Sequence, residues 1–344
     1  MGTGPFQTYT NHNWAIRPGW VFSGDGMDVT TLQMVGSAAG INYNLACISA
    51  DPNIATNNVT ISDLTIDCNW AELSQTADIG TAGGKNIATS AIIVWGSNNL
   101  VERVRAINGY GSWANAREQF LIALGAPSSG EGTNNVIQFC RAEQPQGNYG
   151  NPFALFGWDS SHVITNSRVV GCTAVGVNNG FAVGFTSGGV NFGNVKDCVV
   201  DSNTFIDCYG AAYSDTGSCD GLQVTNNTVI RGWSAIGLGS PTLPKQNIQV
   251  SGNSFSIQNR NNGANDGISV ADAPITNLTV TNNTFSADTS GNGMLQYWGI
   301  IAYSVTNATI TNNIVDPLFY NAVTGIGLTI SNNTQPNGAP VQGL

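Results

Sequence analysis

The sequence predicts an all-β solenoid, in which short strands stack coil upon coil along one axis. One phrase recurs along the chain, its apolar residues alternate with polar ones, and no long helical pattern interrupts it. The phrase reads CVVDSNTF at 198–205, LQVTNNTV at 222–229, IQVSGNSF at 248–255, LTVTNNTF at 278–285, ATITNNIV at 308–315 and LTISNNT at 328–334. Its asparagines are separated by 24, 26, 30, 30 and 20 residues, which is the spacing of stacked supersecondary units.

The alternation V-x-V and I-x-V in each repeat is the pattern of a half-buried strand. Asparagine, glycine, serine and threonine separate the strands. Asparagine suits sharp turns because its side chain can bond the local backbone. We also expect the repeated asparagines to hydrogen-bond one another from coil to coil.

Residues 14–34 read as a strand, a turn at Pro18-Gly19, a second strand, a Gly-Asp-Gly turn and a third strand, which together make a first coil. Residues 1–56 hold this coil and an irregular N-terminal part, regular coils follow over 57–334, and 335–344 form a tail. One continuous repeat predicts a single domain over 1–344. Long excursions in the first four regular coils place the expected site on coils two to five.

The chain resembles the right-handed parallel β-helix proteins of the pectate-lyase type over about residues 57–334. The resemblance implies a single-stranded right-handed parallel β-helix (β-solenoid) of about ten coils. It also implies an extracellular protein, secreted or on a phage or cell surface, with a polysaccharide as its partner. The superfamily contains lyases, hydrolases, epimerases and phage depolymerases, and the NTD…DD…HG…RIK set of polygalacturonases is missing from this sequence.

Composition excludes some functions. The net charge of −10, with only 11 lysines and arginines, disfavours nucleic acid as a partner. No apolar run reaches transmembrane length, and the first residues, MGTGPFQTYTNHNW, show no secretory leader, so we expect no membrane insertion and a leader absent from this chain. The sequence fits a monomer or a homotrimer equally.

The seven cysteines show no metal-binding spacing. Cys172 and Cys208 fall at positions that we align on neighbouring coils, which lie about 4.8 Å apart, within disulfide range. The alternative is that the cysteines are small inert core residues.

A column of arginines is the first candidate site. Alignment of the coils places Arg105, Arg141 and Arg168 in one outward column. Three guanidinium groups on adjacent coils would bind the carboxylates or sulfates of an acidic glycan. The alternative is local ion pairing, of Arg141 with Glu143 and of Arg105 with Glu102.

The second candidate site is the edge of the loops that lead into or out of the third strand of each coil. The predicted catalytic residues are Arg117, Glu118, Tyr149, Asp159 and Asp215, and the predicted substrate-binding residues, besides the arginine column, are Trp95, Trp158 and Tyr213. Aromatic faces bind sugar rings and nearby acids handle protons. The alternatives are partial burial of each tryptophan and a turn-capping role for Asp215. His162, at the start of a coil, is expected to serve a turn.

Two reactions fit these residues. β-Elimination requires a uronate carboxylate neutralised by arginine or by Ca²⁺, the one candidate cofactor, together with a base such as tyrosine. Hydrolysis requires two carboxylates, about 5–5.5 Å apart for retention or roughly 6.5–9.5 Å for inversion, and Glu118, Asp159 and Asp215 are the candidates. The arginine column favours a polysaccharide lyase that acts on a uronate-containing glycan. The alternatives are a glycoside hydrolase and a non-catalytic glycan-binding tailspike or adhesin module.

Overall fold

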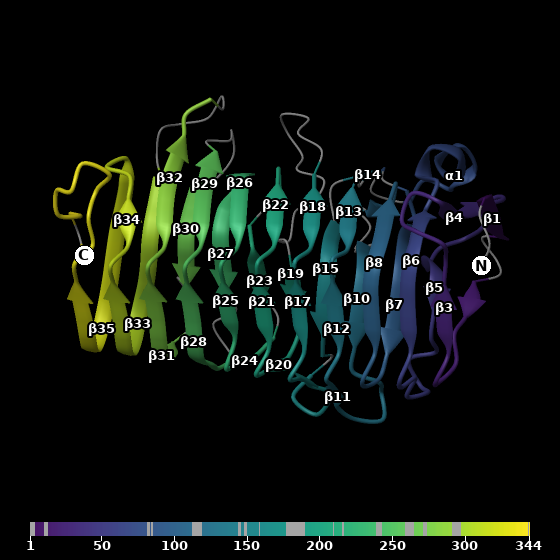
Figure 1. Ribbon diagram of the computed structural model, residues 1–344, viewed down its shortest axis with the longest axis horizontal. Coiled ribbons are helices and arrows are strands. Elements are labelled where there is room, and N and C mark those ends of the chain that lie inside the picture. The colour runs from purple at the N-terminus through teal and green to yellow at the C-terminus, as the bar shows by residue number, and fades with distance from the viewer. Residues whose placement is uncertain are drawn as a thin grey trace.

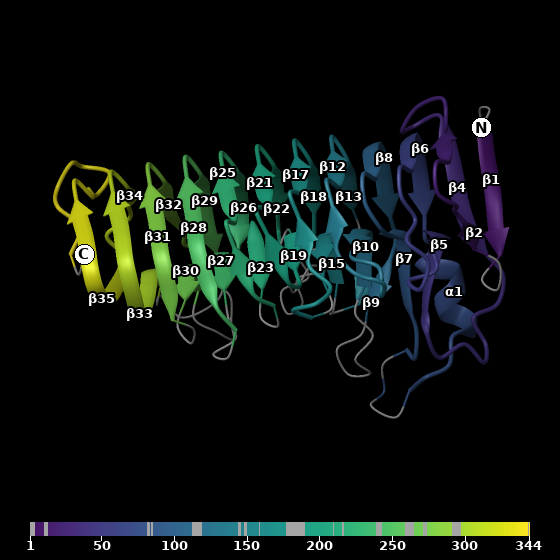
Figure 2. The same ribbon diagram turned by 90° about the horizontal axis from the view of Figure 1, so that it is seen from below.

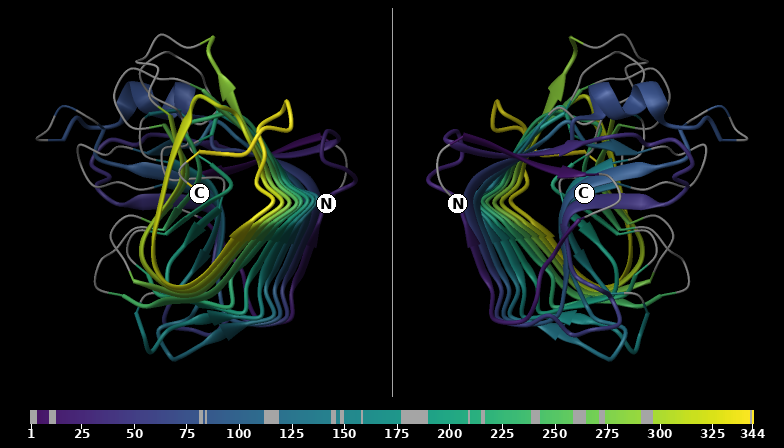
Figure 3. Two further views of the ribbon diagram at one scale, coloured as in Figure 1. Left: turned by 90° about the vertical axis from the view of Figure 1, so that its left-hand side faces the viewer. Right: turned by 90° about the vertical axis from the view of Figure 1, so that its right-hand side faces the viewer.

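A computed structural model describes most of the chain. The residues outside its description are 1–3, 10–12, 81, 82, 84, 112–118, 144, 145, 148, 149, 158, 177–189, 209, 215, 216, 239–242, 259–264, 271–273, 291–296 and 343, together with the side chains of a few strand residues beside them. The described strands form an elongated stack with the two termini at opposite ends (Figure 1). Viewed along its axis, the stack is a tube with three β-faces (Figure 3).

Each coil contributes to three parallel sheets. Sheet I consists of β2 (Trp14–Ala15), β5 (Asn44–Ser49), β7 (Ala88–Trp95), β10 (Gln119–Gly125), β15 (Gly150–Phe156), β19 (Val190–Phe192), β23 (Ala212–Ser214), β27 (Ser234–Leu238), β30 (Asn265–Val270) and the first parts of β33 (Tyr297–Thr311) and β35 (Phe319–Ser331). Sheet II consists of β3 (Val21–Ser23), the first parts of β6 (Thr60–Asp67) and β8 (Leu100–Ile107), β12 (Val136–Gln138), β17 (Arg168–Val170), β21 (Val199–Asp201), β25 (Gln223–Thr225), β28 (Lys245–Ser251), β31 (Ile275–Thr281) and the later parts of β33 and β35. Sheet III consists of β1 (Gly4–Tyr9), β4 (Thr30–Val35), the later parts of β6 and β8, β13 (Arg141–Glu143), β18 (Thr173–Val175), β22 (Thr204–Ile206), β26 (Thr228–Gly232), β29 (Ser254–Gln258), β32 (Thr284–Asp288) and β34 (Ile314–Val315).

Shorter strands complete the stack. β11 (Gly132–Thr133), β16 (Ile164–Thr165), β20 (Val195–Lys196) and β24 (Cys219–Asp220) stack ahead of sheet II, and β9 (Tyr110–Gly111) and β14 (Gln146–Gly147) pair beside β7. The expected first coil over residues 14–34 is present as β2, β3 and β4, one strand in each sheet.

The core is a set of columns in which like residues stack from coil to coil. Ile92 lies beside Ile122 on the next coil, and Ile122 beside Phe153 on the coil after that. All three are fully buried, as strand alternation requires of inward positions. Each coil therefore buries its apolar side chains against its two neighbours, and regular repeats extend the core along the whole rod.

The corners between the sheets explain why asparagine recurs. At most corners one residue adopts the left-handed backbone conformation, which asparagine tolerates better than most other residues. Asparagine occupies this position at 58, 98, 108, 134, 166, 226, 247, 277, 282, 307, 312 and 332. All of these asparagines except the half-buried Asn108 are exposed, and after each exposed one the next residue of the chain is buried.

The inward asparagines form a buried hydrogen-bonded stack between sheets II and III. Asn253 accepts hydrogen bonds at Oδ1 from the backbone N–H (2.8 Å) and the side-chain amide (3.0 Å) of Asn227. It donates in turn to Oδ1 of Asn283 (3.0 and 2.9 Å). The same pattern runs from Asn203 to Asn333. These bonds satisfy buried amide groups on each coil from Asn203 to Asn333.

The predicted alignment of Cys172 with Cys208 is wrong. Register places Cys172 in the column of the asparagine stack: its backbone N–H bonds Asn203, and its Sγ accepts the N–H of Cys140 (3.4 Å). Cys208 lies beyond sheet III, after β22. All seven cysteines are buried as reduced thiols, which agrees with the alternative of inert core residues.

Helix α1 (Trp70–Thr76) lies on the excursion after β6. Its Trp70 ring stacks on the Tyr110 ring, with centroids 3.8 Å apart and planes within 10°. In the described part of the chain no helix combines the length and the apolar character needed to cross a membrane.

Candidate functional site

The outward face of sheet I carries two of the predicted site residues, Trp95 and the backbone of Tyr213. Because Ile92 and Ile122 point inward, Ile93 and Ala123 belong to the outward column, which register continues to Ala154. The loops predicted to carry the chemistry lead directly into β10 and β15. Figure 2 shows α1 and β9 on the side of the rod where β7 and β10 lie.

A hollow in this face, the Trp95 hollow, has a volume of about 260 Å³. It is lined by Asn13, Tyr43, Asn44, Leu45, Ala46, Ser49, Ala50, Ile93 and Trp95. Tyr43 is 52% exposed at its rim, whereas Trp95 is largely buried. The floor is made of small side chains, so that an aromatic wall stands beside a shallow surface.

Gly125 determines the position of the Trp95 ring. The two residues are neighbours on adjacent coils, and a Cβ at position 125 would collide with the ring. The absence of a side chain lets the indole lie over the backbone of the next coil. Phe156 continues this outward column, and its ring lies 5.8 Å from that of Phe120. Aromatic residues therefore follow the face across three coils.

The structure describes only some of the predicted site residues. Trp95 lines the hollow but is largely buried, which agrees with the alternative of partial burial. The backbone of Tyr213 falls in the same outward column as Ala154, through Asn191, but its side chain is outside the description. The remaining residues of this group, Arg117, Glu118, Tyr149, Trp158 and Asp215, lie outside the described residues.

The predicted arginine column is partly wrong. Arg105 and Arg141 are neighbours on sheet III, as expected, but the next residue of that column is Thr173. Arg168 lies on sheet II, between Val136 and Val199. The alignment failed at this coil because Asn166-Ser167 resembles the repeat phrase but precedes sheet II, whereas the inward stack of the coil holds Cys172.

The two arginines that do share a column are ion-paired. Glu143 is buried, and its Oε2 accepts hydrogen bonds from Nε (2.9 Å) and Nη2 (2.8 Å) of Arg105. Its other oxygen pairs with Arg141, and Asp28 lies 3.2 Å from Nη1 of Arg105. Two cations therefore meet two carboxylates, which agrees with the alternative of local pairing and leaves no cationic cradle at Arg105 and Arg141.

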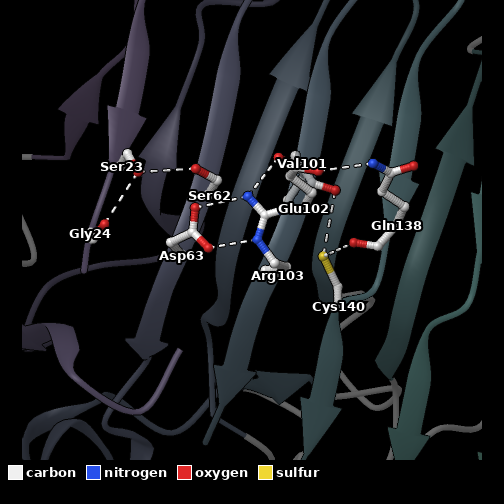
Figure 4. Close-up of polar contacts among 9 residues, drawn as sticks. All are labelled: Ser23, Gly24, Ser62, Asp63, Val101, Glu102, Arg103, Gln138 and Cys140. Atoms are coloured by element: carbon white, nitrogen blue, oxygen red, sulfur yellow. Dashed lines mark hydrogen bonds and ion pairs between the residues drawn. The ribbon is translucent and has the colours of Figure 1, made fainter. Parts of the chain in front are cut away.

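Glu102, the partner expected for Arg105, belongs to a different network at the corner of sheets II and III (Figure 4). It lies 2.8 Å from Nη2 of Arg103 and accepts a hydrogen bond of 2.9 Å from Gln138. Asp63 accepts two bonds from Arg103, at 2.6 and 3.0 Å, and these hold the pKa of Asp63 below its ordinary value. The pKa of Glu102 is lowered mainly by Gln138 and then by Arg103. These bonds tie three coils together.

Asp159, a predicted catalytic residue, caps a turn. Its carboxylate accepts the backbone N–H of Ser161 (2.7 Å) and lies 2.7 Å from Nδ1 of His162, and the Ser161 bond is the main cause of its lowered pKa. Nε2 of His162 lies 3.0 Å from the carbonyl oxygen of Ser128. A carboxyl group with a lowered pKa is ionised at neutral pH and is a poor general acid. The turn role expected for His162 agrees with this geometry.

Among the described residues, no group of three or more histidine, cysteine, aspartate or glutamate side chains is arranged to hold a metal ion.

Comparison with known proteins gives a likeness of fold. No protein-family model and no curated protein sequence matches the chain. A tailspike protein mutant of the E. coli bacteriophage HK620, in complex with a hexasaccharide, superposes with a TM-score of 0.54 at 16% identity, covering 99% of this chain and 60% of the tailspike chain. Endopolygalacturonase I from Stereum purpureum, complexed with two galacturonates, gives 0.51 at 10% identity, covering 97% of this chain and 94% of the other.

These likenesses, with the parallel register of the strands, establish the fold. The chain has the fold of a right-handed parallel β-helix.

Proposed function

We propose that this protein is a carbohydrate-active β-helix that holds a polysaccharide chain against the outward face of sheet I. The observation that carries this proposal is the Trp95 hollow, where Tyr43 and Trp95 stand beside a floor of Ala46 and Ser49. Aromatic rings offer flat apolar area to the faces of sugar rings, and the amide of Asn44 can bond their hydroxyl groups. The two similar structures described above were both solved with sugars bound, which supports the same class of ligand.

We further propose that the protein degrades this polysaccharide outside the cell, with β-elimination of a uronate-containing chain as the reaction. A base removes the C5 proton, the C4–O bond breaks, and the leaving sugar takes a proton while a C4–C5 double bond forms. The ion-paired Arg105 and Arg141 no longer support this choice. Its support is the order of the sequence: Arg117 and Glu118 immediately precede β10, and Tyr149 immediately precedes β15.

The second candidate is a glycan-binding module without catalysis. It is favoured by the lining of the Trp95 hollow, in which every residue is uncharged. Turnover requires an acid or a base within hydrogen-bond reach of the sugar, whereas binding requires only the aromatic and amide surface.

The test is to incubate the protein with a panel of acidic and neutral polysaccharides, with and without Ca²⁺. The ultraviolet absorbance of an unsaturated uronate reports β-elimination, and new reducing ends without that absorbance report hydrolysis. Binding without either signal supports the module. The absence of binding and of turnover on every polymer would contradict the carbohydrate-active proposal as a whole.

A further inference from the structure

The N-terminal end of the rod contains a second, larger hollow, the mouth cavity, of about 420 Å³. One strand of each sheet contributes to its wall: Tyr9 comes from β1, Trp14 from β2 and Phe22 from β3, and Trp20 immediately precedes β3. The right-hand view of Figure 3 looks onto this end of the tube.

The mouth cavity is blind. In the strand pairing, Trp14 lies beside Ile48 and Phe22 beside Ile61 of the next coil. Both isoleucines are fully buried. The volume lies within the range of small-ligand pockets in proteins, about 300–1,000 Å³. A cavity that is closed beneath accepts the end of a chain molecule better than its middle.

The lining fits a sugar ring. Tyr9, Trp14 and Trp20 are 58%, 38% and 47% exposed, which is unusual for three large aromatic side chains around one cavity. Trp14 is held edge-on against Phe22, with ring centroids 5.0 Å apart and planes at 79°, so part of the wall is already ordered. Asn13 supplies an amide at the rim, and all of the lining residues are uncharged, which favours a neutral sugar.

The mouth cavity and the Trp95 hollow share a lining residue. Asn13 lines both, and its side-chain amide donates a hydrogen bond to the hydroxyl of Ser49 on the floor of the Trp95 hollow. We propose that the mouth cavity binds the terminal, neutral sugar unit of the same glycan chain that occupies the Trp95 hollow. This inference rests on the proposed function and assigns that function an end-binding subsite.

The test is calorimetric titration with length series of neutral oligosaccharides, whose terminal unit suits the mouth cavity, and of oligogalacturonides and alginate oligosaccharides, which end in a uronate. The effect of the mouth cavity is expected in the neutral series. Three variants are compared with the wild type: Trp20→Ala in the mouth cavity, Tyr43→Ala in the Trp95 hollow, and Tyr303→Ala as a control, since Tyr303 is exposed in β33 and lines neither cavity. Circular dichroism verifies that each variant is folded, and Trp20→Phe, which retains an aromatic face, replaces Trp20→Ala if that variant is not.

We expect affinity to rise with chain length until the terminal unit reaches the mouth cavity. Trp20→Ala then weakens binding of long oligomers about tenfold, leaving short oligomers unchanged, because one stacking contact is lost. Tyr43→Ala weakens the binding of both short and long oligomers.

The mouth subsite would be overturned if Trp20→Ala bound long oligomers as tightly as the wild type does while Tyr43→Ala bound them weakly. That result would leave the proposed function standing. Concentration-dependent dimerisation that Trp20→Ala abolishes would overturn the mouth subsite as well, since the cavity would then be a protein interface. No binding to any series would contradict the proposed function itself.

Discussion

At the scale of single residues, the inward asparagines form buried hydrogen bonds that no apolar residue can form. Each one accepts the backbone N–H of the preceding coil and donates to a carbonyl oxygen, as Asn253 does to Val224. An alanine there would leave buried donors and acceptors unsatisfied, at about 1–3 kcal/mol for each.

We therefore predict that Asn253→Ala lowers the free energy of unfolding by roughly 3 kcal/mol. Asn307→Gly is the matched control: it changes an exposed asparagine in the left-handed conformation, which glycine also adopts, and should cost less than about 0.5 kcal/mol. Urea denaturation of the three proteins measures both values. Equal stability of the two variants would show that the inward stack contributes nothing.

The arginines give a second prediction at this scale. Arg105→Ala leaves the buried carboxylate of Glu143 with one cation fewer and should lower the free energy of unfolding by about 1–2 kcal/mol, since the pair is only partly screened by solvent. Arg168 is an exposed residue of sheet II, so Arg168→Ala should change the free energy of unfolding by less than about 0.5 kcal/mol. Neither variant should change glycan affinity. A parallel loss of affinity in both would instead restore the cationic cradle.

At the scale of elements, His162 connects two turns at the edge of sheet I. Its ring lies between the carboxylate of Asp159 and the carbonyl oxygen of Ser128, so both ring nitrogens face acceptors and the doubly protonated ring fits best. Ser128 in turn donates from its backbone N–H to the carbonyl oxygen of Pro52 (2.9 Å). Three successive turns are thereby joined.

Asp159 is the main cause of a pKa of His162 above its ordinary value of 6.5. A raised folded-state pKa means that the stabilisation is fully present below the unfolded-state pKa and is lost as pH rises through the folded-state pKa. We predict that the melting temperature of the wild type falls as the pH rises from the unfolded-state pKa of His162 through its folded-state pKa. His162→Gln should reduce this fall. Parallel melting profiles of the two proteins would exclude the connection.

At the scale of the whole molecule, the sequence predicted the solenoid because its periodicity is a property of every coil. The alternating apolar residues and the asparagine phrase repeat. A strand that is misassigned in one coil therefore does not change the fold predicted from the other coils. The prediction failed where a coil departed from the phrase: Asn166-Ser167 resembles the phrase but lies ahead of sheet II, so Arg168 and Cys172 were assigned to the wrong columns.

The candidate site was harder to predict because part of it lies outside the repeat. Trp95 could be found because it ends a recognisable strand. Tyr43 and Trp20 were missed because they stand outside the repeat, on the irregular N-terminal part, and their proximity to Trp95 and Trp14 depends on how the first coils stack. The two tryptophans among residues 14–20, in the first coil, were a signal in the sequence.

The measurement that tests the central claim most directly is the affinity of wild type, Tyr43→Ala and Tyr303→Ala for the polysaccharide that the panel identifies. If the outward face of sheet I holds the glycan, Tyr43→Ala binds about tenfold more weakly and Tyr303→Ala binds as the wild type does. Unchanged affinity of Tyr43→Ala would contradict the claim and move the glycan to another face of the rod.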